Sequence, residues 1–457
     1  MVEFIPLLMF FVICLFFMAG FPVAFTLAGT SLLFAGIGIL FGAFEPALLG
    51  AIPIKLYGDM TNMNLVAVPL FVFMGVLLEK SNLAEDLLGN MAELIGGFRG
   101  SLAISVILVG ALIAASTGIV GATVIAMGLI SLPIMLGRNY DHSLATGTIC
   151  ATGTLGQIIP PSVALVILGD VLSSAYQQSQ LSIGNFSAKT VSVGDLFLGA
   201  IVPGMILVFS YITYVILKSY LNPMTAPAHQ VEKSDQSTLI LVLTNLAPPL
   251  LLIVAVLGSI LAGIATPTEA AGVGAFGAIL LALSKGKLNK KNLTEAVQGT
   301  TEITSMVFMI LIGSSIFVLV FRGFGGDELI TSIFSQIPGG VIGIVLVVMI
   351  LIFLMGFILD FIQIIFILIP MVGPIVMAYG VDPIWLGIMI AINLQTSFLT
   401  PPFGFALFYL RGVAPPEIET ISIYRGVIPF IAIQLALLVV LAVFPQLVTF
   451  LPNLIYS

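Results

Sequence analysis

The sequence predicts an all-α integral membrane protein with an inverted repeat, in which each half holds a re-entrant helical hairpin and a helix broken by Pro-Pro. Composition is the first indication: 60% of the 457 residues are hydrophobic and 8% are charged, whereas soluble domains carry about 25% charged residues. The second is that the apolar segments 147–171 and 389–413 are each interrupted by a polar run ending in Pro-Pro. The third is an amphipathic segment that ends in Gly-Gly before a predicted hairpin in each half.

Composition also limits the kind of protein. So much apolar surface requires lipid as its solvent. The net charge of −7 is spread over several loops and forms no basic patch, so we expect no nucleic-acid partner. Cys14 and Cys150 lie in apolar runs and are interpreted as packing residues. The N-terminal apolar stretch lacks a basic n-region and a small-residue cleavage site, and we interpret it as a retained first span.

The apolar segments follow the same order in both halves. In the first half we expect spans at 4–20, 22–43 and 64–79, a hairpin at 100–137, a broken helix at 143–171 and a span at 196–217. In the second half we expect spans at 239–265, 267–284 and 303–321, a hairpin at 341–379, a broken helix at 384–410 and a span at 427–451. Cytoplasmic loops carry an excess of Lys and Arg, which sets the orientation. With the N-terminus outside, eleven of the 14 basic residues lie inside, and Lys55, Lys189 and Arg322 lie outside.

The two halves contain matching landmarks. The amphipathic segments 82–97 and 327–340 both end in Gly-Gly, and these glycine pairs are 243 positions apart. The Pro-Pro pairs are 241 positions apart. The predicted topology puts the first amphipathic segment on the cytoplasmic face and the second on the outer face, so the halves are related by inversion, as in many carriers. The alternative is two interfacial helices with accidental similarity.

The predicted hairpins enter the membrane from opposite faces. Arg99 and Arg138 flank the first hairpin and hold both of its ends on the cytoplasmic side. A helix over 100–115 reaches about 24 Å, short of a hydrocarbon core about 30 Å thick, so its tip should stop inside the membrane. Two short tilted spans with a tight outer turn are the alternative. The second hairpin turns at 356–360, and Asp360 is a candidate functional residue because a carboxylate at that depth is costly.

The Pro-Pro breaks point to a transport function. Proline removes a backbone donor and restricts the residue before it. A broken helix at membrane depth frees carbonyls and amides that only a protein-lined cavity satisfies. Paired breaks in corresponding places indicate the binding site of a secondary transporter. The amide ends of the half-helices carry partial positive charge and favour a carboxylate.

Five stretches in order carry a family resemblance over nearly the whole chain: GFPVAFTLAG (20–29), GTLGQIIPPS (153–162), ATPTEAAGVGA (265–275), GFILD (356–360) and TPPFG (400–404). With them, the chain resembles the large membrane subunit of tripartite ATP-independent periplasmic (TRAP) transporters. The resemblance implies an elevator-type carrier in the bacterial inner membrane, in which a mobile domain holds the hairpins and broken helices. It implies sodium-coupled uptake of a small organic anion that an extracytoplasmic substrate-binding protein delivers. It also implies a small four-helix membrane subunit, which we expect to be a separate polypeptide.

This organisation divides the chain into eight segments. They are first scaffold spans (1–80), a cytoplasmic arm helix (81–99), hairpin 1 with the first broken helix (100–171), an outer polar loop (172–195), scaffold spans (196–321), an outer arm helix (322–340), hairpin 2 with the second broken helix (341–411) and a last scaffold span (412–457). The two segments with hairpins form the predicted transport domain. The outer polar loop is either a docking surface for the binding protein or a connector.

The resemblance implies two sodium sites where hairpin tips meet helix breaks. The positions matching the first are Thr117, Gly156, Ile159 and Pro160. The family commonly shows Ser-Gly-Ser at this tip, whereas this chain reads Thr-Gly-Ile, so Ser116 or Thr152 would have to supply the second hydroxyl. The symmetric site would use Gly356, Thr396 or Thr400, and Pro401. The residues that could face the substrate in the same cavity are Asn393, Gln395, Thr396, Ser397 and Asp360.

Other function classes fit the sequence less well. A channel or scaffold explains the spans but not the paired breaks. An intramembrane enzyme or an ATP-driven pump would need a nucleophile, zinc or phosphate-loop motif that the chain lacks. A dicarboxylate carrier of similar fold that works without a binding protein is the alternative within transport, although such carriers usually show Ser-Asn-Thr at their hairpin tips. Glu269 is interpreted as a helix cap, with proton carriage as its alternative.

Overall fold

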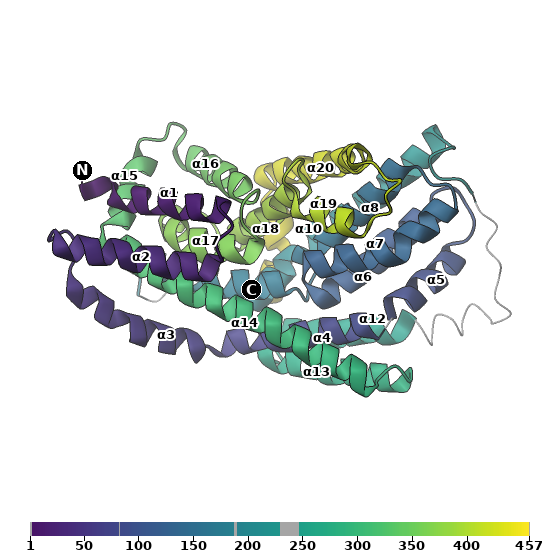
Figure 1. Cartoon of the computed structure of the whole chain (residues 1–457), viewed down its shortest axis with the longest axis horizontal. Coiled ribbons are helices and arrows are strands. Elements are labelled where there is room, and N and C mark those ends of the chain that lie inside the picture. Colours follow the sequence, from purple (N-terminus) through teal and green to yellow (C-terminus); the bar gives the residue numbers. More distant parts are fainter. Residues whose placement is uncertain (1, 82, 187–189, 229–245, 457) are drawn as a thin grey trace. The chain divides into compact units, whose positions relative to one another are not determined.

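The computed structural model describes residues 2–81, 83–186, 190–228 and 246–456, without the side chains of residues 2, 83–86, 116, 117 and 456. Within these ranges every regular element is a helix (Figure 1). Eight of the described helices are long and apolar enough to span a membrane: 23–40, 63–80, 120–137, 193–221, 267–284, 290–323, 361–378 and 420–443. The all-α membrane architecture predicted from the sequence is therefore confirmed.

The chain divides into two compact units, each formed from three separate stretches. Unit 1 comprises 1–65, 167–192 and 302–387, and unit 2 comprises 66–166, 193–301 and 388–457. The helices wholly or mainly in unit 1 are α1 (Ile5–Met18), α2 (Val23–Leu40), α3 (Ile52–Met60), α9 (Val163–Ser182), α14 (Lys290–Gly323), α15 (Gly326–Ser335), α16 (Gly340–Met355) and α17 (Phe361–Ala378). Those wholly or mainly in unit 2 are α4 (Ala67–Lys80), α5 (Leu83–Ile95), α6 (Ser101–Thr117), α7 (Val120–Gly137), α8 (His142–Thr154), α10 (Val193–Leu221), α12 (Ala247–Leu261), α13 (Pro267–Ser284), α18 (Pro383–Leu399), α19 (Phe405–Val413), α20 (Thr420–Val443) and α21 (Gln446–Tyr456).

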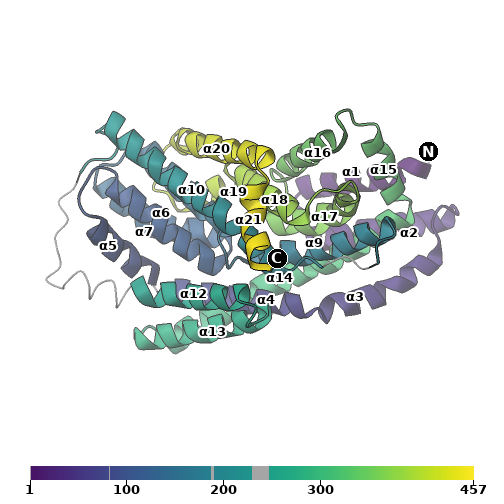
Figure 2. The same cartoon turned by 180° about the vertical axis from the view of Figure 1, so that it is seen from behind.

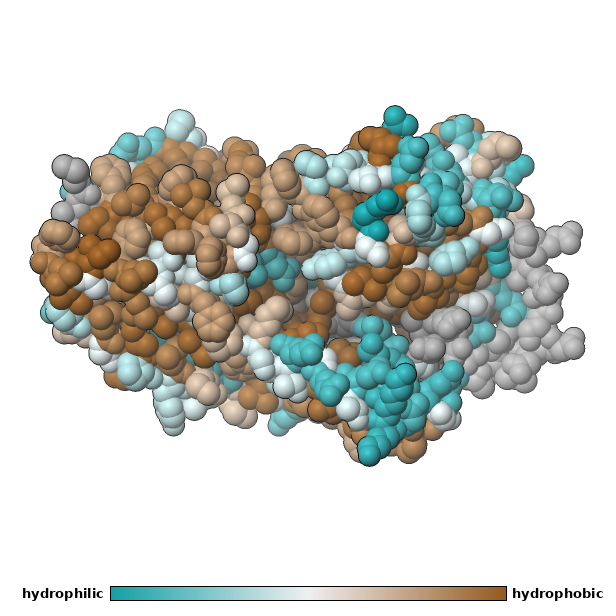
Figure 3. All heavy atoms as spheres, viewed as in Figure 1, coloured by the Kyte–Doolittle hydropathy of each residue, from teal (hydrophilic) through white to brown (hydrophobic). Residues whose placement is uncertain are grey.

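Helix α17 forms the buried centre of unit 1. Fourteen of its residues are buried, and they include the run 364–369. The ring of Phe317 on α14 is also fully buried. Helix α17 packs on α9 where Gly373 meets Ala175, since a Cβ at Gly373 would lie 3.4 Å from the Ala175 side chain (Figure 2). By contrast, α1 and α2 expose large side chains such as Phe11 and Leu33, and Figure 3 shows their apolar surface. This exposed surface suits contact with lipid.

Helix α8 forms the buried centre of unit 2. Its small residues let neighbouring backbones approach closely, as in other membrane helices. A Cβ at Gly147 would lie 2.1 Å from the carbonyl oxygen of Gly426 on α20, so this crossing requires glycine. A Cβ at Gly153 would likewise lie 2.2 Å from the Val124 side chain on α7. The sequence GTICATGT therefore fixes how α8 packs between two helices.

Both predicted helix breaks are confirmed. Helix α8 ends at Thr154, a 3₁₀ turn covers 155–157, and regular structure resumes at Val163. Helix α18 ends at Leu399 and α19 begins at Phe405. The Pro160–Pro161 and Pro401–Pro402 peptide bonds, one in each break, are both cis.

The structure differs from the predicted spans in several places. The last span, expected at 427–451, is two helices, α20 and α21, because Pro445 lacks the N–H that would continue the first. Helix α9 continues to Ser182, so the first part of the predicted outer loop 172–195 is helical. Helix α14 begins at Lys290, ahead of the expected 303. Residues 46–60, which carried no prediction, form a 3₁₀ turn and α3. Part of the span expected at 239–265 lies outside the described residues, and α12 covers the rest from Ala247.

Candidate functional site

The tip of the first hairpin meets the first helix break within unit 2. Gly118 ends α6 with a φ of +62°, a conformation that favours glycine. A Cβ at Gly118 would lie 2.6 Å from the backbone nitrogen of Val163, the first residue of α9. On the other side of the break, a Cβ at Gly156 would lie 3.2 Å from the Ala114 carbonyl oxygen near the end of α6. Two glycines therefore bring the backbones of the tip and the break into direct contact.

At the first break, several backbone oxygens have unused hydrogen-bonding capacity among the described residues. The Ser162 hydroxyl donates to the Gly156 carbonyl at 2.6 Å, which leaves one lone pair on that oxygen. The amides of Ile158 and Ile159 both donate to Leu155. Among the described residues, no hydrogen bond reaches the carbonyl oxygens of Ile159 and Pro160. The predicted positions Gly156, Ile159 and Pro160 thus offer oxygens of the kind that a hard cation prefers.

Of the three predicted hydroxyl ligands, Ser116, Thr117 and Thr152, the structure describes the side chain of Thr152 alone. The side chains of Ser116 and Thr117 lie outside the described part of the structure. The Thr152 hydroxyl donates to the Thr148 carbonyl at 2.6 Å. Its methyl group faces Gly110, because a Cβ there would lie 2.1 Å from it. Gly110 precedes Thr117 by seven helical residues, or about 10 Å, so Thr152 packs well away from the tip.

At the second break, the side-chain hydroxyls form hydrogen bonds to backbone carbonyls of the same segment. The hydroxyls of Thr396, Ser397 and Thr400 donate to the carbonyls of the preceding turn at 2.8 Å each, those of Ile392, Leu394 and Thr396 respectively. Their lone pairs remain available as acceptors. Asn393 is buried in the same helix at 4% exposure. These residues and Pro401 belong to unit 2, whereas Gly356 and Asp360 belong to unit 1. The second sodium site therefore stays a prediction.

Asp360 has a local partner in unit 1. It is the N-cap of α17 and forms a capping box with Gln363. The Asp360 N–H donates to the Gln363 Oε1 at 3.0 Å. A capping box satisfies two amides that the first turn of a helix would otherwise leave unpaired. Asp360 thus has a structural role beside the functional role that its depth predicts.

Two glutamines at the breaks stand out. The Gln395 Nε2 donates to the Thr154 hydroxyl at 3.1 Å, which links the two broken helices. Gln157, in the 3₁₀ turn of the first break, is 1% exposed. Neither its Nε2 nor its Oε1 has a partner in the described part of the chain. Sequence reasoning missed Gln157, and its place three residues before Pro160 was the available signal.

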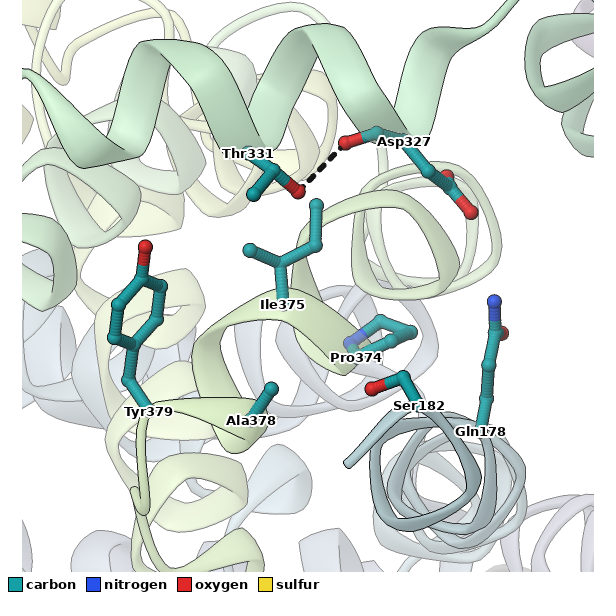
Figure 4. A pocket seen from close by; sticks show the side chains of 8 residues that line it. All are labelled: Gln178, Ser182, Asp327, Thr331, Pro374, Ile375, Ala378 and Tyr379. Carbon is teal, nitrogen blue, oxygen red and sulfur yellow. Dashed lines mark hydrogen bonds between the residues drawn. The ribbon is translucent and has the colours of Figure 1, made fainter. Parts of the chain in front are cut away.

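A pocket of about 330 Å³ lies in unit 1, and Figure 4 shows its lining. It is lined by the end of α9 (Gln178, Ser182), by α15 (Asp327, Thr331) and by the end of α17 (Pro374, Ile375, Ala378, Tyr379). Arg322 links its walls: it donates to the Gln178 Oε1 at 2.6 Å and to the Pro370 carbonyl at 2.9 Å, and its Nε lies 3.2 Å from an Asp327 oxygen. Burial raises the pKa of the Asp327 carboxyl, and Arg322 opposes that rise.

No group of three His, Cys, Asp or Glu residues in the described ranges could hold a metal ion. An ion bound to the described part of the chain would therefore need backbone carbonyl and hydroxyl oxygens as ligands. Unit 2 supplies such oxygens at the first break. The arrangement is suited to reversible binding of a small ion, since neutral ligands hold it without a formal countercharge.

Comparison with known proteins gives consistent results. Residues 8–447 match the family model described as "Tripartite ATP-independent periplasmic transporter, DctM component". The chain is 28% identical to the C4-dicarboxylate TRAP transporter large permease protein DctM of Vibrio cholerae, over 98% of this chain and 97% of that protein. It is also 28% identical to the sialic acid TRAP transporter large permease protein SiaM of the same organism, over 95% and 96%. The crystal structure of the Alcanivorax borkumensis YdaH transporter has a similar fold, with a TM-score of 0.65 at 14% identity over 96% of this chain and 98% of that one.

Proposed function

Because the chain belongs to the DctM component family of tripartite ATP-independent periplasmic transporters, we propose that it couples sodium influx to the uptake of a small organic anion. As a large permease subunit it is a transporter and not an enzyme. A binding protein outside the cytoplasmic membrane delivers the anion, and a small membrane subunit, with four helices by family resemblance, completes the complex. The N-terminus lies outside, as the distribution of Lys and Arg predicts.

The contact between the first hairpin tip and the first break carries the sodium part of this proposal. Gly118 and Gly156 bring the two backbones together, and the carbonyls of Gly156, Ile159 and Pro160 point to an oxygen-rich ion site. Sodium is a hard cation and takes such oxygens without needing a carboxylate. Thr117 would add a hydroxyl from the tip. For the second sodium site, the family resemblance implies Gly356, Thr396 or Thr400, and Pro401.

The anion class rests on chemistry and on the relatives. One relative is named for C4-dicarboxylates and another for sialic acid, and both kinds of substrate carry a carboxylate. The half-helix amide ends at each break favour such a group. We place the anion near Asn393, Gln395, Thr396 and Ser397, and we expect an elevator movement to carry it across.

Uptake into proteoliposomes tests this function. The chain is reconstituted with the small subunit and the binding protein encoded beside its gene, and sodium gradient and binding protein are each supplied or omitted. Uptake that needs both supports the proposal. Uptake without the binding protein would instead support a free-standing dicarboxylate carrier, and uptake driven by a proton gradient alone would contradict sodium coupling.

A further inference from the structure

The amide of Gln157 is buried and has no hydrogen-bond partner among the residues that the structure describes. Its side chain is 1% exposed, and neither polar atom bonds to any described residue. An amide removed from water without a hydrogen bond destabilises the fold, so such groups are rare in native proteins. Within the described residues of unit 2, its Nε2 is the one buried side-chain nitrogen that lacks an acceptor.

The 3₁₀ turn of the first break indicates that the Gln157 side chain lies on the same face as that of Thr154. Residues 155–157 form a 3₁₀ turn, in which side chains three residues apart eclipse one another. Thr154 in turn accepts a hydrogen bond from Gln395 at 3.1 Å. Thr154 and Gln395 are 241 positions apart, the spacing of the two Pro-Pro pairs, so they occupy equivalent places in the two repeats. The hydrogen bond between Thr154 and Gln395 thus joins the two breaks across the internal symmetry, and Thr154, Gln157 and Gln395 are here called the amide cluster.

Hydrogen bonding fixes which atoms of the cluster are open. The Thr154 hydroxyl donates its proton to the Ala151 carbonyl at 2.8 Å, so it accepts from Gln395. Gln395 must therefore present its NH₂ to Thr154 and its Oε1 elsewhere. That oxygen is buried and has no partner among the described residues. The cluster offers the unpaired NH₂ group of Gln157 as a donor and unpaired amide oxygens on both glutamines as acceptors.

We propose that the amide cluster binds the transported anion, with Gln157 donating from Nε2 to its carboxylate. The proposal rests on the function proposed above and narrows the substrate class. Because Gln395 presents an acceptor, the favoured anion carries a hydroxyl or N–H beside the carboxylate, as malate and sialic acid do. Thr154 is a positioning residue, since it acts by orienting Gln395.

Equilibrium dialysis of radiolabelled malate and sialic acid tests this inference. The chain is purified with its small subunit in saturating sodium, without the binding protein. Gln157→Met keeps the length of the side chain and removes both polar atoms, so we expect the Kd of the better-bound probe to rise about 10- to 100-fold, the value of a hydrogen bond to a charged group. The matched control is Gln434→Met, because Gln434 is a fully buried glutamine of unit 2 whose Nε2 donates to the Tyr211 hydroxyl at 2.8 Å. Its Kd should stay within about twofold of wild type, below the energy of one hydrogen bond.

Thr154 variants separate positioning from packing. Thr154→Val removes the hydroxyl and should raise the Kd of the probe. Thr154→Ser keeps the hydroxyl and should have a Kd close to that of the wild type. An unchanged Kd in Gln157→Met, or equal effects of Gln157→Met and Gln434→Met, would overturn the role of Gln157. Binding of neither probe to the wild type would overturn the substrate class. Binding or uptake by the wild type that does not depend on sodium would contradict the proposed function. The difference in Kd between Gln157→Met and Gln434→Met would still test the role of Gln157.

Discussion

At the residue scale, glycines decide whether the proposed ion site can form. Gly118 combines a positive φ with close contact to the Val163 backbone, so it has two independent reasons to be glycine. Gly156 approaches the other side of the same hairpin. These contacts concern backbone atoms, which cannot move aside as a flexible side chain does. The site is therefore sensitive to a single added methyl group.

We predict that Gly118→Ala weakens sodium binding. The new Cβ would force the tip away from the break, and we expect the sodium concentration for half-maximal uptake to rise at least about tenfold, equivalent to 1.4 kcal/mol. The measurement is uptake across a series of sodium gradients. Gly263→Ala is the matched control, because Gly263 has a φ of +67° in unit 2 and a Cβ there would meet no atom within 4 Å. Equal shifts in both variants would mean that backbone strain, and not the tip contact, is responsible.

The substitution Asp360→Asn tests whether the negative charge at the second hairpin is needed for transport. Asparagine caps helices as well as aspartate does, so Asp360→Asn should insert and fold normally. We expect its uptake rate to fall about tenfold or more, because a neutral amide would weaken the predicted contact of Asp360 with the substrate, and hydrogen bonds to a charged group contribute about 1.5–3 kcal/mol. Asp382→Asn is the control, since Asp382 also accepts from a helix N-terminus, the Trp385 amide, at 2.8 Å. Normal uptake by Asp360→Asn would leave Asp360 with its capping role alone.

At the element scale, Arg322 ties α14 to the helices around it. It bonds to Gln178 on α9 and to the Pro370 carbonyl on α17, and it pairs with Asp327 on α15. Guanidinium is suited to this task because its planar donors reach several acceptors at once. Arg322 thus adds a polar link to the apolar packing of α15 through Ile330 and Phe334 in unit 1.

The pH dependence of stability should report on Asp327. Burial raises its pKa above the ordinary value of 3.8, so the folded state favours the protonated form. The stability that this group contributes is present below pH 3.8 and is lost as pH rises through the higher folded pKa. The melting temperature of Asp327→Asn relative to wild type should therefore increase with pH. A relative melting temperature that falls with pH would mean that the pair with Arg322 outweighs burial.

Glu269 is expected to act on α13 alone. Its Oε2 accepts from the Thr266 N–H and hydroxyl at 2.8 Å each, which confirms the predicted capping role. Glutamine also completes a capping box, so Glu269→Gln should leave uptake unchanged, whereas Glu269→Ala removes the acceptor for the Thr266 N–H and should lower the melting temperature. Uptake and thermal unfolding measured on both variants check this. Loss of uptake in Glu269→Gln with normal stability would favour proton carriage.

Features of the fold and of the candidate site could be predicted from the sequence where they depend on neighbouring residues, and could not where they depend on packing between distant helices. Local rules located both breaks and the α13 cap, because proline and capping residues act within a turn. The same rule at Pro445 explains the split between α20 and α21, which the continuous apolar run around this proline conceals. For Gln157 the sequence signal was its place three residues before Pro160, whereas its lack of a hydrogen-bond partner among the described residues depends on how the helices of unit 2 pack. The course of α9 to Ser182 likewise depends on its packing against α17, which no local pattern encodes.

At the scale of the whole molecule, the two units differ in their content of charged residues. Unit 1 carries nine acidic and three basic residues, and unit 2 carries twelve and eleven. The eleven basic residues predicted to lie inside all belong to unit 2, and the three predicted outside all belong to unit 1. Because Lys and Arg set orientation, we expect unit 2 to fix the topology of the chain.

Sodium and substrate fluxes measured together give the most direct test of sodium-coupled uptake. Proteoliposomes containing the full complex and loaded binding protein receive ²²Na⁺ and radiolabelled substrate, and both tracers are counted over time. We predict that sodium enters in a fixed ratio to substrate, and that Gly118→Ala lowers both fluxes at limiting sodium while Gly263→Ala does not. Substrate influx without accompanying ²²Na⁺ would contradict sodium coupling.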